Sequence, residues 1–328
     1  MKAVWITWEN QRRNRELSAA FGMKLYEFKE VDDIKNPIEK YASGLARTIR
    51  AILSERPSLV CCQNPSLVLS AFLVAAGKMA GFKVCVDSHN AGLFPKEGRS
   101  VILSGLSRLI QKGADLNLVT NEGLRRHVEE NGGRAFILED KIPGIPTVPP
   151  KKLKGEFNIL FICSYAEDEP YRLVFDAAGK LDPGIHIYVT GDYRKRNIDP
   201  SGLPSNVTLM GYVPEDEYVL MLNSVDATLD LTERENCLVC GAYETLSVGK
   251  PQILSDTKAL KNYFCKGAVY APHTVQGIHD SILMLRERYP QLAKEAEELR
   301  LELRQEWDSR KAVLMSMLDD LGRKNHGA

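Results

Sequence analysis

The sequence has no long apolar run and no excess of charge of one sign. Its 328 residues include 43 basic and 43 acidic side chains, so the formal net charge is zero and composition gives no general case for nucleic acid binding. No apolar run reaches the roughly 18 residues that indicate a membrane span. The first residues also lack the apolar region and the small-residue cleavage site of a signal peptide. We therefore expect a cytoplasmic protein without nucleic acid as a partner.

Cysteine is present, but not in a pattern that predicts disulfides or a metal site. The seven cysteines are scattered through apolar segments, as is typical of reduced, buried thiols. Cys237 and Cys240 form a C-x-x-C pair, but a zinc site would need a second pair of ligands, and Cys265 stands alone. A redox role would need a thioredoxin-like context, which this sequence does not provide. We interpret the pair as structural thiols at the start of a helix.

Common nucleotide, hydrolase and metal motifs are also absent. The sequence contains no Walker-type phosphate loop, no G-x-G-x-x-G, no G-x-S-x-G, no H-E-x-x-H and no EF-hand loop. Asp32-Asp33 and Asp319-Asp320 are adjacent pairs and not a D-x-D metal motif. We therefore predict no metal ligands.

Short apolar runs alternate with amphipathic segments through two successive halves of the chain, which predicts mostly parallel sheets covered on both faces. A break at 143–154, PGIPTVPPKKLK, carries four prolines, which neither a helix nor a central strand tolerates. We predict two Rossmann-like domains, 1–148 and 149–295, followed by a charged helical segment at 296–328. Expected elements include helices at about 14–21, 37–55 and 100–112 and strands at 59–63 and 83–87.

The most informative segment is 231–256, LTERENCLVCGAYETLSVGKPQILSD. It predicts a strand end, an acidic loop, a helix beginning near Leu238 and a turn into another strand. Ligands of open α/β sheets bind where strands end and helices begin, and a helix start presents unpaired N–H groups and a positive dipole end. Glu244 would lie in this helix, with Glu233 and Glu235 in the loop before it. The arrangement favours a phosphorylated sugar.

The segment resembles the nucleotide-sugar site of GT-B glycosyltransferases, in particular the large retaining family 4. In that family two Glu residues are separated by seven others, and this spacing leads back from Glu244 to Asn236, with Glu235 one residue out of register. We keep both Glu235 and Asn236 as candidates for the residue that contacts the donor sugar. The residues that carry the resemblance are Gly241, Glu244, Gly249, Lys250, Pro251 and Asp256.

The resemblance implies a GT-B fold, with two Rossmann-like domains facing across a cleft and a final helix that often crosses back to the first domain. The acceptor would bind 1–148 and the nucleotide sugar 149–295. Glu244 would contact the nucleotide ribose, while Gly241, beside Cys240, would allow close approach at the helix start. No cofactor is required besides the nucleoside-diphosphate sugar, because a helix start and cations can stabilise the leaving diphosphate.

Cations for the diphosphate are expected in an unusual place. Many family members have an Arg and a Lys in the loop that corresponds to 164–170, but here that loop is acidic. Arg194 and Lys195, which follow the next predicted strand, are the alternative, although a surface turn would explain them too. Tyr212 and Val213 belong to a segment similar to G-x-V/L-P and are expected to border the nucleotide base.

Two candidate sites fall in the first half. Arg12, Arg13 and Arg15 follow the first strand, where a guanidinium could clamp a phosphate or a sugar carboxylate; a solvated helix start is the alternative. His89 belongs to Asp87-Ser88-His89, which matches the D-x-H segment of many GT-B proteins. We predict that His89 positions the donor sugar or the acceptor, against the alternative of a polar group with a structural role.

We predict a glycosyltransferase that moves a sugar, with retention of configuration, to a glycan, a lipid-linked acceptor or a small molecule. The helix at 100–112, SVILSGLSRLIQK, has an apolar face flanked by basic residues, so it could lie on a membrane surface as well as cover the sheet. A nucleotide-sugar 2-epimerase on the same fold is one alternative. A catalytically silent scaffold that binds a glycan or a protein partner is the other.

Overall fold

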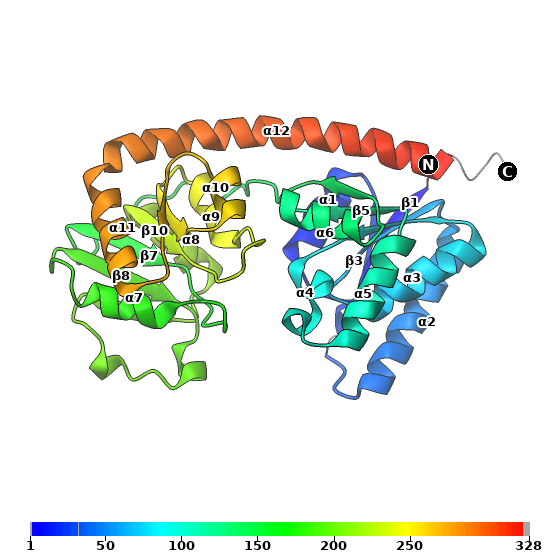
Figure 1. Cartoon of the computed structure of the whole chain (residues 1–328), viewed down its shortest axis with the longest axis horizontal. Helices are drawn as coiled ribbons and strands as arrows, with labels where there is room; N and C mark the ends of the chain where they lie inside the picture. Colours follow the sequence, from blue (N-terminus) through cyan, green and yellow to red (C-terminus); the bar gives the residue numbers. More distant parts are fainter. Residues whose placement is uncertain (1, 32, 324–328) are drawn as a thin grey trace. The chain divides into compact units, whose positions relative to one another are not determined.

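A computed structural model describes residues 2–31 and 33–323, which divide into two compact units (Figure 1). Unit 1 contains the chain up to Asp140 together with the residues from Trp307 onward, and unit 2 is Lys141–Glu306. Each unit has its own six-stranded parallel sheet covered by helices. The alternating α/β architecture predicted from the sequence is therefore confirmed.

The sheet of unit 1 has the strand order β2-β1-β3-β4-β5-β6. The central strand β3, Leu59–Gln63, is buried at every position, as expected for a parallel strand covered on both faces. Its neighbours are in a register that places Gln63 beside Asp87. The other strands are β1 (Ala3–Thr7), β2 (Lys24–Glu27), β4 (Lys83–Asp87), β5 (Leu116–Val119) and β6 (Ala135–Ile137).

The helices of unit 1 begin and end where the sequence provides caps. Helix α2, Pro37–Glu55, has proline in its first turn, and the side chain of Asn36 accepts hydrogen bonds from the N–H groups of Ile38 and Glu39. Helices α2, α3 and α5 cover one face of the sheet. The remaining elements are α1 (Arg12–Ala20), α3 (Leu67–Ala80), α4 (Asn90–Leu93), α5 (Val101–Gly113), α6 (Glu122–Glu130) and the 3-10 turns η1 (Lys29–Val31) and η2 (Pro95–Gly98).

The sheet of unit 2 has the strand order β12-β11-β10-β7-β8-β9. Strands β7 and β8 are buried throughout. The strands are β7 (Phe157–Phe161), β8 (Ile185–Thr190), β9 (Val207–Gly211), β10 (Ala227–Asp230), β11 (Gln252–Ser255) and β12 (Ala268–Ala271). The helices are α7 (Tyr171–Ala178), α8 (Glu215–Ser224), α9 (Cys240–Ser247), α10 (Lys258–Tyr263) and α11 (Val275–Glu287).

One connection in unit 2 differs from the others. Within the described part of the chain, every connection between successive strands of a sheet contains an α-helix except the one from β8 to β9. That connection has only two 3-10 turns, η3 (Tyr193–Arg196) and η4 (Pro200–Gly202).

The proline-rich segment is held against unit 2. The backbone N–H groups of Val148 and Lys151 donate to the side chains of Asn223 and Ser224 at the end of α8. The N–H of Lys154 donates to the hydroxyl of Tyr188 on β8 at 2.9 Å. Side-chain acceptors thus satisfy a backbone that has no strand partner.

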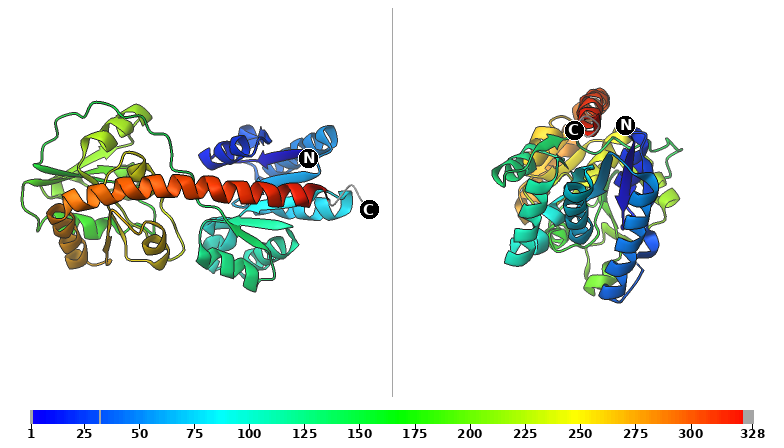
Figure 2. Two further views of the ribbon diagram at one scale, coloured as in Figure 1. Left: turned by 90° about the horizontal axis from the view of Figure 1, so that it is seen from above. Right: turned by 90° about the vertical axis from the view of Figure 1, so that its right-hand side faces the viewer.

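The last helix, α12 (Tyr289–Arg323), is one continuous element (Figure 2). Leu299 and Leu303, in its first half, belong to a core cluster of unit 2. Trp307, Leu314 and Leu318, in its second half, belong to a core cluster of unit 1. Spacings of four and seven residues place each set on one side of the helix. No helix in the described part of the chain combines the length and the apolarity needed to cross a membrane.

For most of these elements the sequence predicted the limits to within about two residues, which is the usual scatter at helix and strand ends. The last helix is an exception, because it was expected from 296 and begins at Tyr289. The helix expected near Leu238 begins at Cys240, and the one expected from about Asn14 begins at Arg12. Helix α10 was not predicted, because its six residues are too short to show a helical repeat.

Trp307 tests whether α12 stabilises unit 1. The ring is 3% exposed, and its Nε1 donates to the carbonyl of Glu139 at 3.0 Å. Trp307→Ala should lower the free energy of unfolding of unit 1 by about 3–5 kcal/mol, because it removes a large buried ring and leaves a cavity. Hydrogen exchange during denaturant unfolding would report each unit separately. Val313→Ala on the same helix, where the side chain is 55% exposed, is the control; equal effects of the two changes would contradict the prediction.

Candidate functional site

The polar side chains of unit 1 gather at the carboxyl edge of its sheet. Register pairs Ile6 with Cys62 and Gln63 with Asp87, so the ends of β1, β3 and β4 lie next to one another. Ligands of open α/β sheets bind at this edge.

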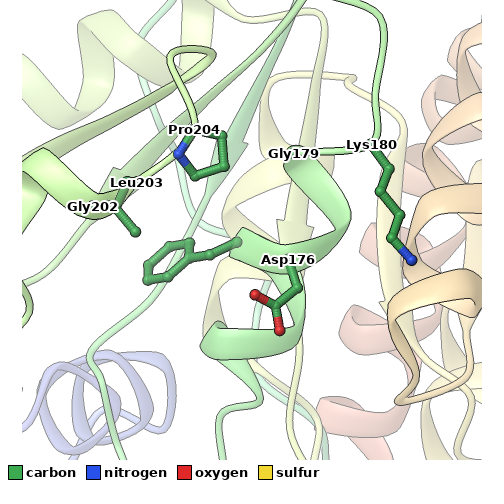
Figure 3. A pocket seen from close by; sticks show the side chains of 7 residues that line it. Asp176, Gly179, Lys180, Gly202, Leu203 and Pro204 are labelled. Atoms are coloured by element: carbon green, nitrogen blue, oxygen red, sulfur yellow. The ribbon is translucent and has the colours of Figure 1, made fainter.

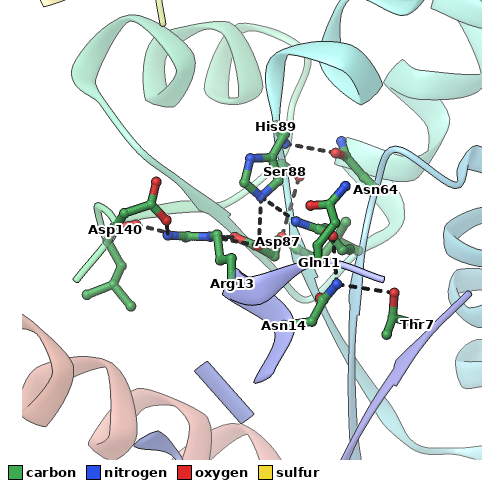
Figure 4. Close-up of polar contacts among 12 residues, drawn as sticks. Thr7, Gln11, Arg13, Asn14, Asn64, Asp87, Ser88, His89 and Asp140 are labelled. Atoms are coloured by element: carbon green, nitrogen blue, oxygen red, sulfur yellow. Dashed lines mark hydrogen bonds and ion pairs between the residues drawn. The ribbon is translucent and has the colours of Figure 1, made fainter. Parts of the chain in front are cut away.

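Arg13 and Asp87 form a buried ion pair at this edge (Figure 4). Two guanidinium nitrogens of Arg13 bind the carboxylate of Asp87 at 2.9 and 2.8 Å, and a third binds Asp140 at 2.6 Å. Burial raises the pKa of Asp87, but the charge of Arg13 and the hydrogen bonds from His89 and Arg13 outweigh burial and hold that pKa well below its usual range. Arg13 therefore binds two carboxylates of the chain itself, and it orients Asp87.

His89 lies on the other side of Asp87. Its Nε2 is 2.8 Å from Oδ2 of Asp87 and 2.9 Å from the amide nitrogen of Gln63. A carboxylate only accepts hydrogen bonds, so Nε2 carries the proton and donates to Asp87. Nδ1 then keeps a lone pair that can accept a hydrogen bond from a hydroxyl group. With a side chain 26% exposed, His89 can meet a ligand.

Buried amides fix the position of the ring. Asn14 is fully buried; it accepts from the indole of Trp5 at 2.8 Å and donates to Oε1 of Gln63 at 2.8 Å. This orientation places the amide nitrogen of Gln63 2.9 Å from Nε2 of His89, as a packing contact and not a hydrogen bond, because Nε2–H already donates to Asp87. Asn64 accepts from the backbone N–H of His89 at 2.8 Å. A Cβ at Gly92 would lie 2.3 Å from Cγ of Asn64, so only glycine lets this turn approach so closely.

Arg12 and Arg15, the other predicted arginines, lie at the surface of unit 1. Arg12 pairs with Glu16 at 2.6 Å and Arg15 with Glu27 at 3.0 Å. Their side chains are 55% and 44% exposed. Neither contacts the His89 network directly among the contacts that the structure describes.

In unit 2, carboxylates gather at the carboxyl edge of the sheet. Asp230 ends β10 and is 7% exposed, and Glu169 lies in the loop that follows β7. Burial first, then repulsion by Glu169 and Glu244, raises the pKa of Asp230 well above its usual value. This edge therefore has a local excess of negative charge that the neutral overall composition conceals.

Gly241 lies in the first turn of α9, next to Asp230. Its backbone N–H donates to the Asp230 carboxylate, and a Cβ at this position would lie 2.4 Å from Oδ2 of Asp230. A side chain at 241 would therefore push the carboxylate away from the helix start. Cys240, which precedes Gly241, is exposed, and all seven cysteines of the chain are thiols.

Glu244 lies one turn further along α9 and is half-buried. One of its oxygens accepts a hydrogen bond from the hydroxyl of Tyr218 at 2.5 Å. Burial, together with the neighbouring charge of Glu244, raises the pKa of Tyr218 far above its usual value, so the phenol stays protonated and donates. Tyr218 thus orients Glu244 from the neighbouring helix α8.

The acidic loop before α9 is held in place by Asp168. The hydroxyl of Thr232 donates to Asp168 at 2.6 Å, and Arg234 forms an ion pair with it at 3.3 Å. Further along the loop, Glu235 is exposed and Asn236 is half-buried. Both remain candidates for contact with a sugar.

The cations predicted near the diphosphate lie in and around η3. Arg194 pairs with Asp192 at 2.6 Å and has a side chain 72% exposed, and Lys195 is exposed. The next residue, Arg196, was not predicted, yet its Nε donates to the carbonyl of Tyr165 in the loop after β7 at 2.8 Å. Arg196 is therefore the cation of this turn that contacts that loop.

Tyr212 and Val213, the residues predicted to border a base, follow β9. Tyr212 is 79% exposed and Val213 is half-buried. They come after Gly211, whose positive φ of 74° turns the chain at the end of the strand. An exposed tyrosine ring at a strand end is free to stack on a planar base.

Two adjoining hollows lie elsewhere in unit 2, between α7 and the connection from β8 to β9. Their volumes are about 450 and 320 Å³, and both include Phe175, Asp176 and Leu203. Figure 3 shows the larger one, between α7 and the turn at 202–204. None of the predicted site residues lines either hollow.

No group of three or more possible metal ligands is found among the described residues. The structure also adds residues that sequence reasoning missed. Asp230 and Tyr218 looked like ordinary members of a strand and a helix, and Glu169 like one of several acids in a loop. The one available signal was their position relative to central strands, since Asp230 is the last residue of β10 and Glu169 lies in the loop after β7.

Comparisons with known proteins identify the fold. No family model matches the sequence, and no curated protein matches it. Among solved structures, a sucrose-phosphate synthase from Thermosynechococcus elongatus has a TM-score of 0.79 at 11% identity, covering 98% of this chain and 99% of that one.

Two other solved structures point the same way. Anabaena HepE in complex with UDP and glucose has a TM-score of 0.74 at 13% identity, covering 97% of this chain and 99% of that one. The lipopolysaccharide outer core galactosyltransferase WaaB has a TM-score of 0.61 at 14% identity, covering 92% and 98%. At these identities the likeness shows the fold alone. Together with the two parallel six-stranded sheets, it shows that this chain has the GT-B fold.

Proposed function

We propose that this protein is a glycosyltransferase of the hexosyltransferase type. It moves a sugar from a nucleoside-diphosphate sugar to an acceptor, with retention of configuration as in the family 4 enzymes that its sequence resembles. The carrying observation is Glu244, which is half-buried one turn into α9 and oriented by Tyr218. The fold is shared with HepE, whose structures hold UDP, glucose or UDP-glucose.

In this proposal residues 149–295 bind the donor. Glu244 accepts hydrogen bonds from the ribose, and Gly241, beside Cys240, lets the phosphates approach the helix start. Tyr212 and Val213 border the base, while Arg194 and Lys195 approach the diphosphate. Leaving-group charge is stabilised by these cations and by backbone N–H groups, and we propose that no resident cofactor is needed.

Residues 1–148 bind the acceptor in this proposal, and His89 is the residue that meets a substrate hydroxyl group. Its Nε2–H is fixed by Asp87, and its Nδ1 accepts from the hydroxyl. Asp87 is a positioning residue, held in turn by Arg13. Glu235 or Asn236 contacts the hydroxyl groups of the donor sugar.

A silent scaffold is the second candidate, and one observation favours it. The carboxyl edge of unit 2 carries the carboxylates of Asp230, Glu169 and Glu244, which repel a diphosphate. A protein with this edge could bind a neutral glycan without transferring a sugar. Nucleotide binding distinguishes the two candidates.

Glu244→Gln tests the donor site. A thermal-shift screen of nucleotide sugars identifies the donor, because a ligand that binds only the native state raises the apparent stability. Calorimetry on the variant should then show ten- to hundredfold weaker binding, since about 1.5–3 kcal/mol of charge-assisted hydrogen bonding is lost. Glu287→Gln, an exposed change on α11, is the control. Unchanged affinity in folded Glu244→Gln would contradict the ribose role.

We also propose that unit 1 contacts a membrane, which would suit a lipid-linked acceptor. Ile38 at the start of α2, with Val101 and Ile102 at the start of α5, are 81%, 86% and 84% exposed. Helices α2 and α5 both begin at the carboxyl edge of the sheet, since they connect parallel strands. The segment 95–113 carries Lys96, Arg99, Arg108 and Lys112 against one acid, Glu97. Exposed aliphatic side chains beside basic ones are typical of helices that lie on anionic lipid.

Vesicle binding tests this contact. The double change Val101→Ser and Ile102→Ser should weaken binding to phosphatidylglycerol vesicles at least tenfold, because two apolar side chains no longer enter the lipid. Met79→Ser is the control. Met79 is 87% exposed, but it lies in the last turn of α3 and therefore away from the carboxyl edge of the sheet, where α2 and α5 begin. Equal losses in both variants, or equal binding of the wild type to uncharged phosphatidylcholine vesicles, would contradict the proposal.

A further inference from the structure

The loop after β7 surrounds an anion that belongs to the protein itself. The backbone N–H groups of Ser164 and Ala166 both donate to Oε2 of Glu169, at 2.9 and 3.0 Å. The hydroxyl of Ser164 donates to the other carboxylate oxygen at 2.8 Å. The thiol of Cys163 is 3.2 Å from Oε2. Four donors from three residues of one loop thus converge on a single carboxylate.

The backbone conformation explains why the N–H groups converge. Tyr165, between the two donors, has a φ of 61°, in the left-handed region. Alternation of ordinary and left-handed residues turns successive N–H groups to the same side and produces a nest for an anion. Nests of this kind bind phosphate groups in many proteins. We call the N–H groups of Ser164 and Ala166 the β7 nest.

Contacts that do not involve Glu169 support the β7 nest. The Nε of Arg196 donates to the carbonyl of Tyr165 at 2.8 Å, and the ring of Tyr165 is 2% exposed. A Cβ at Gly191 would lie 2.2 Å from the carbonyl oxygen of Cys163, so the chain after β8 packs directly on this loop. The nest therefore keeps its shape whether or not Glu169 fills it.

The β7 nest also lies where a ligand of this fold would bind. Strand β7 is in the middle of the sheet, between β10 and β8, and the nest begins three residues after Phe161, at its carboxyl end. The nest and the start of α9, where Gly241 donates to Asp230, both present N–H groups at this edge. In both places a carboxylate of the chain accepts the hydrogen bond that a phosphate oxygen could accept.

We propose that Glu169 is an intramolecular competitor of the donor phosphates: its carboxylate occupies the β7 nest and must leave before a diphosphate can bind there. The proposal rests on the proposed function for the identity of the ligand, although the nest itself does not. It makes Glu169 the residue that sets the affinity for diphosphates. It also explains how a loop without arginine or lysine between 162 and 170 can bind an anion.

Inorganic pyrophosphate is the direct probe, because it carries the diphosphate without a base or a sugar. Glu169→Gln removes the negative charge and keeps the shape and one acceptor oxygen, so pyrophosphate should bind about five- to tenfold more tightly by calorimetry. Glu167→Gln is the matched control, since Glu167 lies two residues away and is exposed; it changes the net charge equally and should alter the affinity less than twofold. No gain in Glu169→Gln, or the same gain in Glu167→Gln, would overturn the proposal.

A second measurement does not depend on a variant that folds. In wild-type protein, saturation with pyrophosphate should shift the backbone amide resonances of Ser164 and Ala166 in an NMR spectrum, because their acceptor changes from carboxylate to phosphate. Unmoved resonances at saturation would overturn the proposal. If the proposed function is wrong and this proposal is right, no nucleotide sugar will bind, while pyrophosphate will still bind Glu169→Gln more tightly than the wild type.

Discussion

Full burial of two parallel sheets is the constraint on which the rest of this structure depends. Strands such as β3 and β7 are covered at every position, so their faces can carry only apolar or fully paired side chains. Polar chemistry is left to the sheet edges, and the helix starts supply N–H groups at the carboxyl edge. Both candidate sites are found there, one in each unit.

The two edges balance charge in different ways. In unit 1 the buried carboxylate of Asp87 is paired with Arg13 and accepts a hydrogen bond from His89, so its charge is compensated and the imidazole is oriented. In unit 2 the carboxylates of Asp230 and Glu169 are satisfied chiefly by N–H, hydroxyl and thiol donors. A buried carboxylate without a cation is costly, and the raised pKa of Asp230 expresses this cost. We infer that an anionic ligand of unit 2 has to compete with the carboxylates of the protein.

The fold could be predicted from the sequence because the patterns that indicate strands, helices and the domain break are local. Runs such as 59–63 and the proline break are properties of a few neighbouring residues, and strand–helix alternation determines a parallel sheet. The same reasoning placed His89 just after a strand and Glu244 within the first turns of a helix, and the structure has them at the N-cap of α4 and one turn into α9. It did not find the partners, because Arg13–Asp87 and Tyr218–Glu244 join residues 74 and 26 positions apart. The acidic loop at 164–170 was recognised as unusual, but only coordinates reveal that Glu169 accepts hydrogen bonds from that loop's own N–H groups.

The central claim is that this GT-B protein transfers sugar, and turnover of the donor tests it most directly. Each nucleotide sugar that stabilises the protein should be incubated with it, and release of the nucleoside diphosphate followed over time. The account predicts slow hydrolysis of one donor, faster in the presence of the correct acceptor and reduced at least tenfold in His89→Asn, which removes the group that meets the hydroxyl. Tight binding of a nucleotide sugar with release no faster than in buffer, for every acceptor tried, would contradict the account, because the protein would then bind a donor without transferring its sugar.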